Sequence, residues 1–113
     1  AFPTLLENFA MVLLEAMAAG AAFVSTDAPG CGELVNHGEN GLLARAGDVD
    51  DFALQLERVL NEPKLRTALA QNAREFVQAY SWKNVARQYE ELFNELRSTP
   101  KEVSQSGRDQ KKP

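Results

Sequence analysis

The chain has 113 residues, of which 44% are hydrophobic, so it is long enough for one domain with a core of modest size. Its formal net charge is -4 and its basic residues form no cluster, which argues against a nucleic-acid surface. Cys31 is the single cysteine, so we expect neither an internal disulfide nor a multi-cysteine zinc site, and the cytoplasm is the default compartment.

The first part of the chain predicts helices and strands in alternation. Apolar residues recur at helical spacing over 9–19 and Gly20 follows, which predicts a short, mostly buried helix. The apolar run 22–26 predicts a strand covered on both faces, as in a parallel sheet. A glycine-rich turn follows, with one helical turn expected at 33–35, and then a second short strand at 41–44.

The rest of the chain predicts helices only. Asp48 is expected to cap a helix, and Pro63 to stand in the first turn of the next one. Ser81 is expected to cap a last helix that Trp82 anchors against the domain by packing. The expected apolar face of the helix after Asp48 is Phe52, Leu56, Val59 and Leu60, and that of the last helix is Val85, Tyr89, Leu92, Phe93 and Leu96.

This order of elements predicts an α/β fold with a partial, Rossmann-like parallel sheet followed by three helices. The expected domain covers residues 1–97, and residues 98–113 are expected to be a disordered polar tail. Two strands do not make a stable sheet alone, so further strands are expected upstream or from another chain. An exposed sheet edge and uncovered apolar surface predict self-association, including by exchange of elements between chains.

Two carboxylates border the start of the first expected helix. Glu7 lies in the preceding loop, and Glu15 lies about one and a half turns further along. The free amides near 10–12 are a ready site for a diphosphate, and the carboxylates could hold sugar and ribose hydroxyls on either side. Acidic residues near a helix N-terminus are also common stabilisers, worth roughly 0.3–1 kcal/mol. Glu15 fits that reading less well, because it interrupts an apolar segment where a charge is costly unless it faces a cleft or a partner.

Several segments together resemble the C-terminal domain of the group 1 glycosyl transferases, which have the GT-B fold. They lie in register from Ala1 to about Leu96, and the segments that carry the resemblance are 7–20, 24–27, 30–35, 38–43 and 81–82. The family transfers a sugar, with retention of configuration, from a nucleoside diphosphate donor, usually without a required metal. The resemblance implies a glycan or lipid-linked acceptor, bound mostly by an N-terminal domain that this chain lacks, and a place in polysaccharide biosynthesis.

The resemblance also implies a role for each matching residue. It places Glu7 beside the transferred sugar as the catalytic candidate and Glu15 at the ribose. The donor-binding amides are then those of Phe9 and Ala10 at the sugar hydroxyls and of Met11 and Val12 near the phosphates. No metal ligand is expected, and the nucleotide sugar is the substrate. Without the basic pair that precedes this segment in the family, the chain alone is expected to be inactive.

The chain departs from the family pattern at Asn8 and Ala10, where glycines are usual. A non-catalytic interaction module that keeps the fold therefore stays open, as does a helical adaptor built on 48–97. His37 is expected to be an exposed loop residue and Cys31 a buried structural one. A location in the cytoplasm, or at the inner face of the membrane, is expected.

Overall fold

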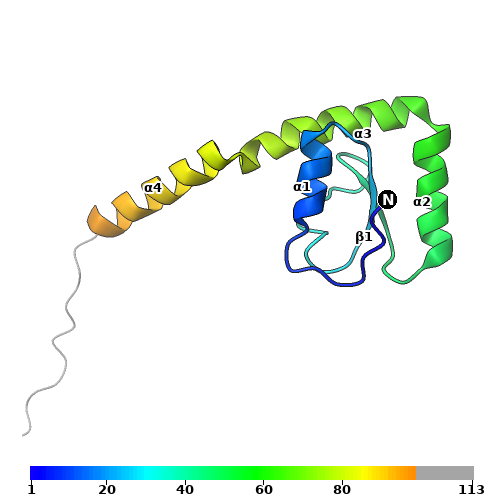
Figure 1. Ribbon diagram of the computed structural model, residues 1–113, viewed down its shortest axis with the longest axis horizontal. Coiled ribbons are helices and arrows are strands. Elements are labelled where there is room, and N and C mark those ends of the chain that lie inside the picture. The colour runs from blue at the N-terminus through cyan, green and yellow to red at the C-terminus, as the bar shows by residue number, and fades with distance from the viewer. Residues whose placement is uncertain (99–113) are drawn as a thin grey trace, which may run out of the picture.

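A computed structural model of the chain describes residues 1–98 (Figure 1). The elements in chain order are α1 (Met11–Ala18), β1 (Val24–Thr26), β2 (Leu42–Ala44), α2 (Val49–Asn61), α3 (Pro63–Phe76), a 3₁₀ helix η1 (Val77–Tyr80) and α4 (Trp82–Ser98). The predicted fold class is therefore confirmed, with a small parallel sheet followed by three α-helices. Ser98 ends α4, and the rest of the predicted tail lies outside the described residues.

The sheet is parallel and is extended by the first residues of the chain. β1 and β2 pair with Val24 opposite Leu42 and Thr26 opposite Ala44. Phe2 forms a parallel bridge with Ser25, and its N–H donates to the carbonyl of Val24 at 2.9 Å. The segment before α1 therefore runs along the other edge of β1, which brings it beside the turn that follows this strand.

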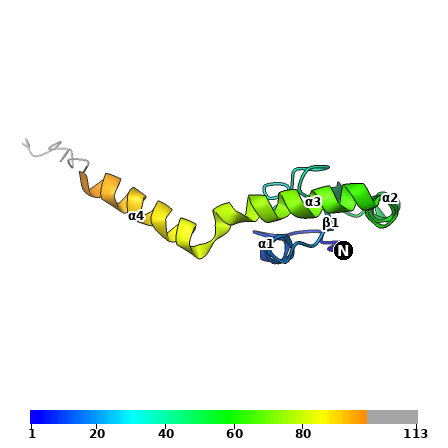
Figure 2. The same cartoon turned by 90° about the horizontal axis from the view of Figure 1, so that it is seen from above.

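Two apolar clusters hold the helices around the sheet, which lies between α1 and α2 in Figure 1. The first cluster includes Leu13, Met17, Phe23, Cys31 and Leu34. The second joins Val24 and Leu42 of the strands to Val59 of α2 and Leu69 of α3. Helix α3 packs against both α1 and α2, as the view from above also shows (Figure 2). Cys31 is fully buried, which confirms the prediction that it is a buried residue of the core.

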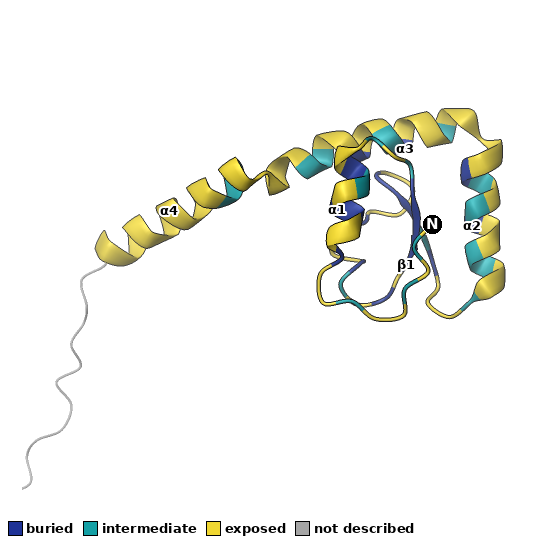
Figure 3. Cartoon of the chain, in the orientation of Figure 1, coloured by how far each residue is buried: buried dark blue, intermediate teal, exposed yellow. Residues whose placement is uncertain are grey.

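Helix α4 leaves the body of the molecule after η1 (Figures 1 and 3). It packs only against η1, and none of its described residues is buried. The prediction that Trp82 anchors this helix is therefore wrong, since Trp82 is 83% exposed.

One smaller prediction, on the buried face of α2, was also wrong. The expected face of α2 included Leu60, which is 63% exposed, whereas Gln55 is buried in its place. The helix is turned so that Gln55 can accept a hydrogen bond from Arg58 and donate one to Asp51. The single helical turn expected at 33–35 is present, since the Val35 N–H donates to the Cys31 carbonyl four residues before it and the Leu34 N–H donates to the same carbonyl.

The cap of α2 is formed as the sequence predicted. The Asp48 side chain accepts a hydrogen bond from the Asp51 N–H at 2.9 Å. The Asp51 carboxylate in turn accepts from the Arg45 N–H at 2.8 Å and from the Gln55 side chain at 3.2 Å. These bonds tie the loop after β2 to the first turn of α2. No helix within residues 1–98 is long and apolar enough to cross a membrane.

Asp51 makes the stability of this region depend on pH. The hydrogen bond from the Arg45 backbone, and next the one from Gln55, hold the pKa of Asp51 below its ordinary value of 3.8. A carboxyl with a lowered folded-state pKa stabilises the fold above its unfolded pKa and loses that effect as pH falls through the folded pKa. We expect Asp51→Asn to lower the melting temperature at pH 7, and the difference from wild type to shrink below pH 3.8. Melting curves from pH 7 downward check this, with Asp50→Asn in the same helical turn as the control.

Candidate functional site

The start of α1 carries backbone amides without a protein acceptor. Ala10 precedes the helix, no side chain caps it, and the first turn has no acidic residue. Among the described residues, no hydrogen bond uses the N–H of Asn8, Phe9 or Val12 as its donor. Uncapped amides at the positive end of a helix form a site for an anion such as a phosphate.

The loop before α1 is fixed by the turn that follows β1. The Glu7 N–H donates to the Pro29 carbonyl at 3.2 Å, and the Ala10 N–H donates to the Gly30 carbonyl at 3.4 Å. Two hydrogen bonds across the chain therefore set the path of the loop. The Met11 N–H donates to the Phe9 carbonyl at 2.9 Å. Two of the amides that the sequence predicted for a ligand, those of Ala10 and Met11, therefore have acceptors within the chain.

Gly30 lets the two segments approach each other. Its φ is +83°, and a Cβ built there would lie 2.5 Å from the carbonyl oxygen of Glu7. The neighbouring atoms belong to the backbone of Glu7 and Asn8, so no side-chain rotation could make room. Sequence reasoning marked this turn as glycine-rich but did not identify the close approach, which depends on tertiary structure.

The carboxylate of Glu7 is positioned by a chain of hydroxyl groups. The Thr4 hydroxyl donates to Oε1 of Glu7 at 3.1 Å, and the Thr26 hydroxyl at the end of β1 donates to the Thr4 carbonyl at 2.6 Å. Glu7 itself is half-buried. Sequence reasoning missed Thr4, although a threonine three residues before an acidic residue in a loop is a recognisable local pattern.

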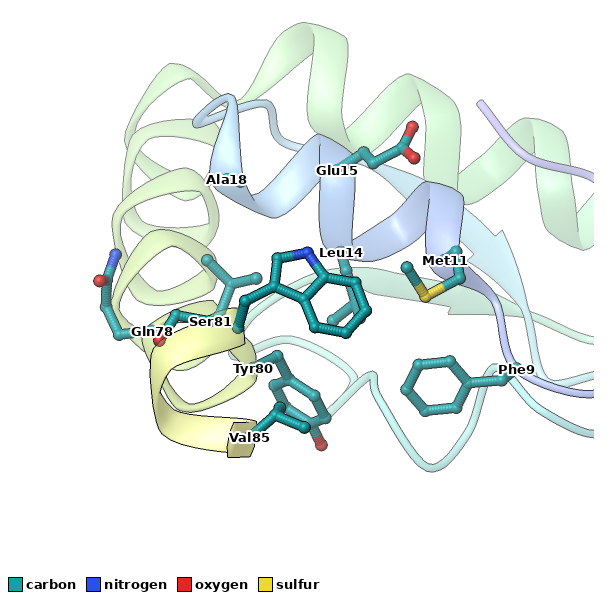
Figure 4. Close-up of a pocket in the computed structure, with 11 residues that line it drawn as sticks. Phe9, Met11, Leu14, Glu15, Ala18, Gln78, Tyr80, Ser81 and Val85 are labelled. Carbon is teal, nitrogen blue, oxygen red and sulfur yellow. The ribbon is translucent and has the colours of Figure 1, made fainter. Parts of the chain in front are cut away.

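Glu15 lies on the exposed side of α1, at the border of an apolar cleft of about 480 Å³ (Figure 4). The cleft separates α1 from η1 and the first turns of α4, and Phe9 and Tyr80 pack across it with ring centroids 6.3 Å apart. Figure 4 shows the Glu15 carboxylate pointing away from these rings. A charge in an apolar helix is thus tolerated because it faces open space.

The two non-glycine residues of the loop need no strained backbone. No described residue other than glycine has a positive φ, and Ala10 has φ -79°. Ala10 is also 1% exposed, so its methyl group lies in the core and leaves the loop's outer side free. Asn8 is exposed and is the substitution that a ligand would meet.

Polar residues outside this loop do not form a second candidate site among residues 1–98. His37 is exposed, as predicted, and its Nδ1 accepts a hydrogen bond from the Leu43 N–H at 2.9 Å. Within residues 1–98 no group of three His, Cys, Asp or Glu side chains is placed to hold a metal ion. The candidate functional site therefore consists of the loop 4–10, Gly30 and the start of α1.

Comparison with known proteins identifies this arrangement. The sequence model of the family described as glycosyl transferases group 1 matches residues 1–76. The chain belongs to the group 1 glycosyl transferases. The resemblance seen in the sequence is thus confirmed. The residues of this glycosyl transferase chain that match the family model include the loop before α1.

Curated relatives of this glycosyl transferase chain are much longer than the chain itself. It is 36% identical over 102 residues to the D-inositol 3-phosphate glycosyltransferase of Corynebacterium urealyticum, covering 90% of this chain and 24% of that protein. It is 33% identical over 91 residues to the N-acetyl-alpha-D-glucosaminyl L-malate synthase of Bacillus anthracis, covering 80% and 24%. The chain therefore spans about a quarter of the length of these relatives.

Solved structures show the same fold at similar coverage. The sucrose-phosphate synthase of Thermosynechococcus elongatus superposes with a TM-score of 0.76 at 34% identity, covering 83% of this chain and 24% of that one. HepE of Anabaena, crystallised in complex with UDP-glucose, gives a TM-score of 0.73 at 28% identity, covering 80% and 25%.

Proposed function

We propose that residues 1–97 form the donor-binding part of a retaining glycosyltransferase. This enzyme would transfer a sugar from a nucleoside diphosphate sugar to a glycan or lipid-linked acceptor. The observation that carries the proposal is the uncapped start of α1, with free amides at Phe9 and Val12 and the half-buried Glu7 beside them. The UDP-glucose complex of HepE, which has the same fold, supports a donor of this class.

The geometry suggests how the roles are divided. The free amide of Val12 meets the diphosphate and that of Phe9 the sugar hydroxyls, and the positive end of α1 stabilises the charge that develops as the diphosphate departs. Glu7, held by Thr4, acts at the transferred sugar, while the exposed Glu15 takes the ribose hydroxyls. The amides of Ala10 and Met11, which have acceptors within the chain, contribute direct contacts only when those bonds open on binding. No resident metal is proposed.

The remaining parts of the reaction are assigned to a longer polypeptide. The chain spans about a quarter of the length of its relatives, so we place the acceptor site and the basic groups that neutralise the leaving diphosphate in a further domain. The 113 residues alone should bind donor weakly and not transfer its sugar, since positioning and charge stabilisation are incomplete. We propose that the enzyme works in the cytoplasm or at the inner face of the membrane.

The proposal is tested by titrating the polypeptide that contains this chain with UDP-glucose, UDP-N-acetylglucosamine and GDP-mannose in a calorimeter. We expect saturable binding of at least one donor. Glu15→Gln should weaken that binding about tenfold, since hydrogen bonds to a charged group contribute about 1.5–3 kcal/mol. Glu57→Gln, on the exposed side of α2, is the matched control and should change nothing. Binding of no donor would favour the alternative of a non-catalytic interaction module.

Thr4 gives a finer prediction on the same site. Thr4→Val removes the hydroxyl that holds Glu7, so kcat should fall about tenfold while the fold is kept. Thr4→Ser keeps the hydroxyl and should retain most of the activity. Steady-state kinetics of both variants in the longer polypeptide check this, and a loss in Thr4→Ser that Thr4→Val does not show would mean that Thr4 acts by packing instead.

We also propose that the chain self-associates through the apolar surface that it leaves exposed.

A further inference from the structure

The side chain of Phe9 is held by an aromatic contact with a distant part of the chain. Its ring centroid lies 6.3 Å from that of Tyr80 in η1, and the Tyr80 ring lies 5.5 Å from that of Phe76 at the end of α3. Figure 4 shows the Phe9 ring directed toward the Tyr80 ring. Both separations lie in the range of about 4.5–7 Å in which aromatic rings attract each other. Because Phe76 packs against the first apolar cluster, this row of three rings joins the loop before α1 to the core.

Tyr80 lies on an element that is itself well fixed. The 3₁₀ helix η1 continues directly from α3 and packs against α1, α3 and α4. The Asn84 side chain donates to the Gln78 carbonyl at 2.8 Å, and the Ser81 N–H donates to the same carbonyl at 3.3 Å. Tyr80 therefore meets Phe9 from a position that hydrogen bonds and packing define on both sides.

The ring contact holds the part of the loop that carries a free amide. Hydrogen bonds to the turn after β1 fix the loop at Glu7 and Ala10, on either side of Phe9. The Met11 N–H holds the Phe9 carbonyl at 2.9 Å, and Tyr80 holds the Phe9 ring. Fixing two substituents of a tetrahedral Cα also fixes where the third, the amide nitrogen, lies. The direction of the Phe9 N–H, which has no acceptor among the described residues, therefore depends on Tyr80.

The contact lies at the surface of the described chain, and the core does not depend on it. Phe9 is 41% exposed and Tyr80 is 37% exposed. A change of the Tyr80 side chain should therefore act on the loop before it acts on the fold.

We propose that Tyr80 is a positioning residue for the sugar end of the donor site. It acts through Phe9, whose N–H it aims at a hydroxyl group of the transferred sugar. The inference rests on the proposed function, in which Phe9 meets the sugar and Val12 meets the diphosphate. Loss of the Tyr80 ring should therefore weaken binding of a nucleotide sugar but not of the nucleoside diphosphate alone.

The test is calorimetric titration of the polypeptide that contains this chain with UDP-glucose, UDP-N-acetylglucosamine and GDP-mannose, and also with UDP and GDP. For a donor that binds, Tyr80→Leu should raise its Kd about three- to tenfold, the effect of one misplaced hydrogen bond. The Kd of the corresponding nucleoside diphosphate should stay within about twofold of wild type. Tyr80→Phe keeps the ring, so it should bind both ligands as wild type does. Melting curves show whether each variant keeps its fold.

The comparison of the two ligands separates a positioning role from a structural one. Equal losses for donor and diphosphate would show that Tyr80 only supports the fold, and unchanged binding of both would show that the ring does not position Phe9. Either result overturns the inference and leaves donor binding in place. A wild type that binds none of the three donors would contradict the proposed function, and this inference with it.

Discussion

Gly30→Ala will lower the free energy of unfolding by about 2–5 kcal/mol and will also weaken donor binding. A side chain in the left-handed region costs roughly 1–2 kcal/mol, and forcing atoms into a packed site costs about 1–3 kcal/mol. Both costs apply here, because φ is +83° and the added Cβ would meet the Glu7 backbone at 2.5 Å. The loop must move to make room, and the free amides of the site move with it.

Two other glycines separate these effects. Gly38 has φ +81° and open space around its missing Cβ, so Gly38→Ala should cost only the roughly 1–2 kcal/mol of the left-handed backbone. Gly32 has neither a positive φ nor a neighbour within 4 Å, and Gly32→Ala should be close to neutral. Urea unfolding followed by circular dichroism gives all three values. If Gly30→Ala cost no more than Gly38→Ala, the close contact between the two segments would be wrong.

Leu69→Ala should destabilise the chain by about 2–5 kcal/mol, because truncating a buried leucine removes apolar contacts and leaves a cavity. Leu69 is fully buried where α3 meets Val24, Leu42 and Val59, so it joins both strands to α2. That loss is a large share of the roughly 5–15 kcal/mol by which a typical domain is stable.

An exposed leucine on the neighbouring helix provides the comparison for Leu69. Leu60 is 63% exposed, and Leu60→Ala should stay within about 0.5 kcal/mol of wild type. Thermal or urea unfolding of the two variants distinguishes them. Similar losses would mean that the second apolar cluster does not hold the sheet to α2 and α3.

Local signals in the sequence predicted most of the fold. Gly20 ends α1 with φ +73°, Asp48 caps α2, and Pro63 opens α3, each for a reason that lies within a few residues. The errors concern long-range packing. The periodicity of α2 did not show that Gln55 would turn inward in place of Leu60, and that of α4 did not show that its apolar face would stay exposed among residues 1–98.

Local signals also predicted the outline of the candidate site. Glu7 and the amides near 10–12 are close in the sequence, so their approach to the helix start could be inferred from spacing. The parts that hold them come from elsewhere in the chain. Thr26 and Gly30 reach the loop only because Phe2 pairs with β1, and no periodicity in the sequence shows that pairing.

The central claim is that the start of α1 binds the diphosphate of a nucleotide sugar. The most direct measurement is a two-dimensional ¹H–¹⁵N NMR titration of the 113-residue chain with UDP, in which each backbone amide gives its own signal and weak binding is visible. We expect the largest shift at the free amide of Val12, with smaller ones at Phe9 and Gly30. Shifts confined to other parts of the chain, or none at millimolar UDP, would contradict the claim.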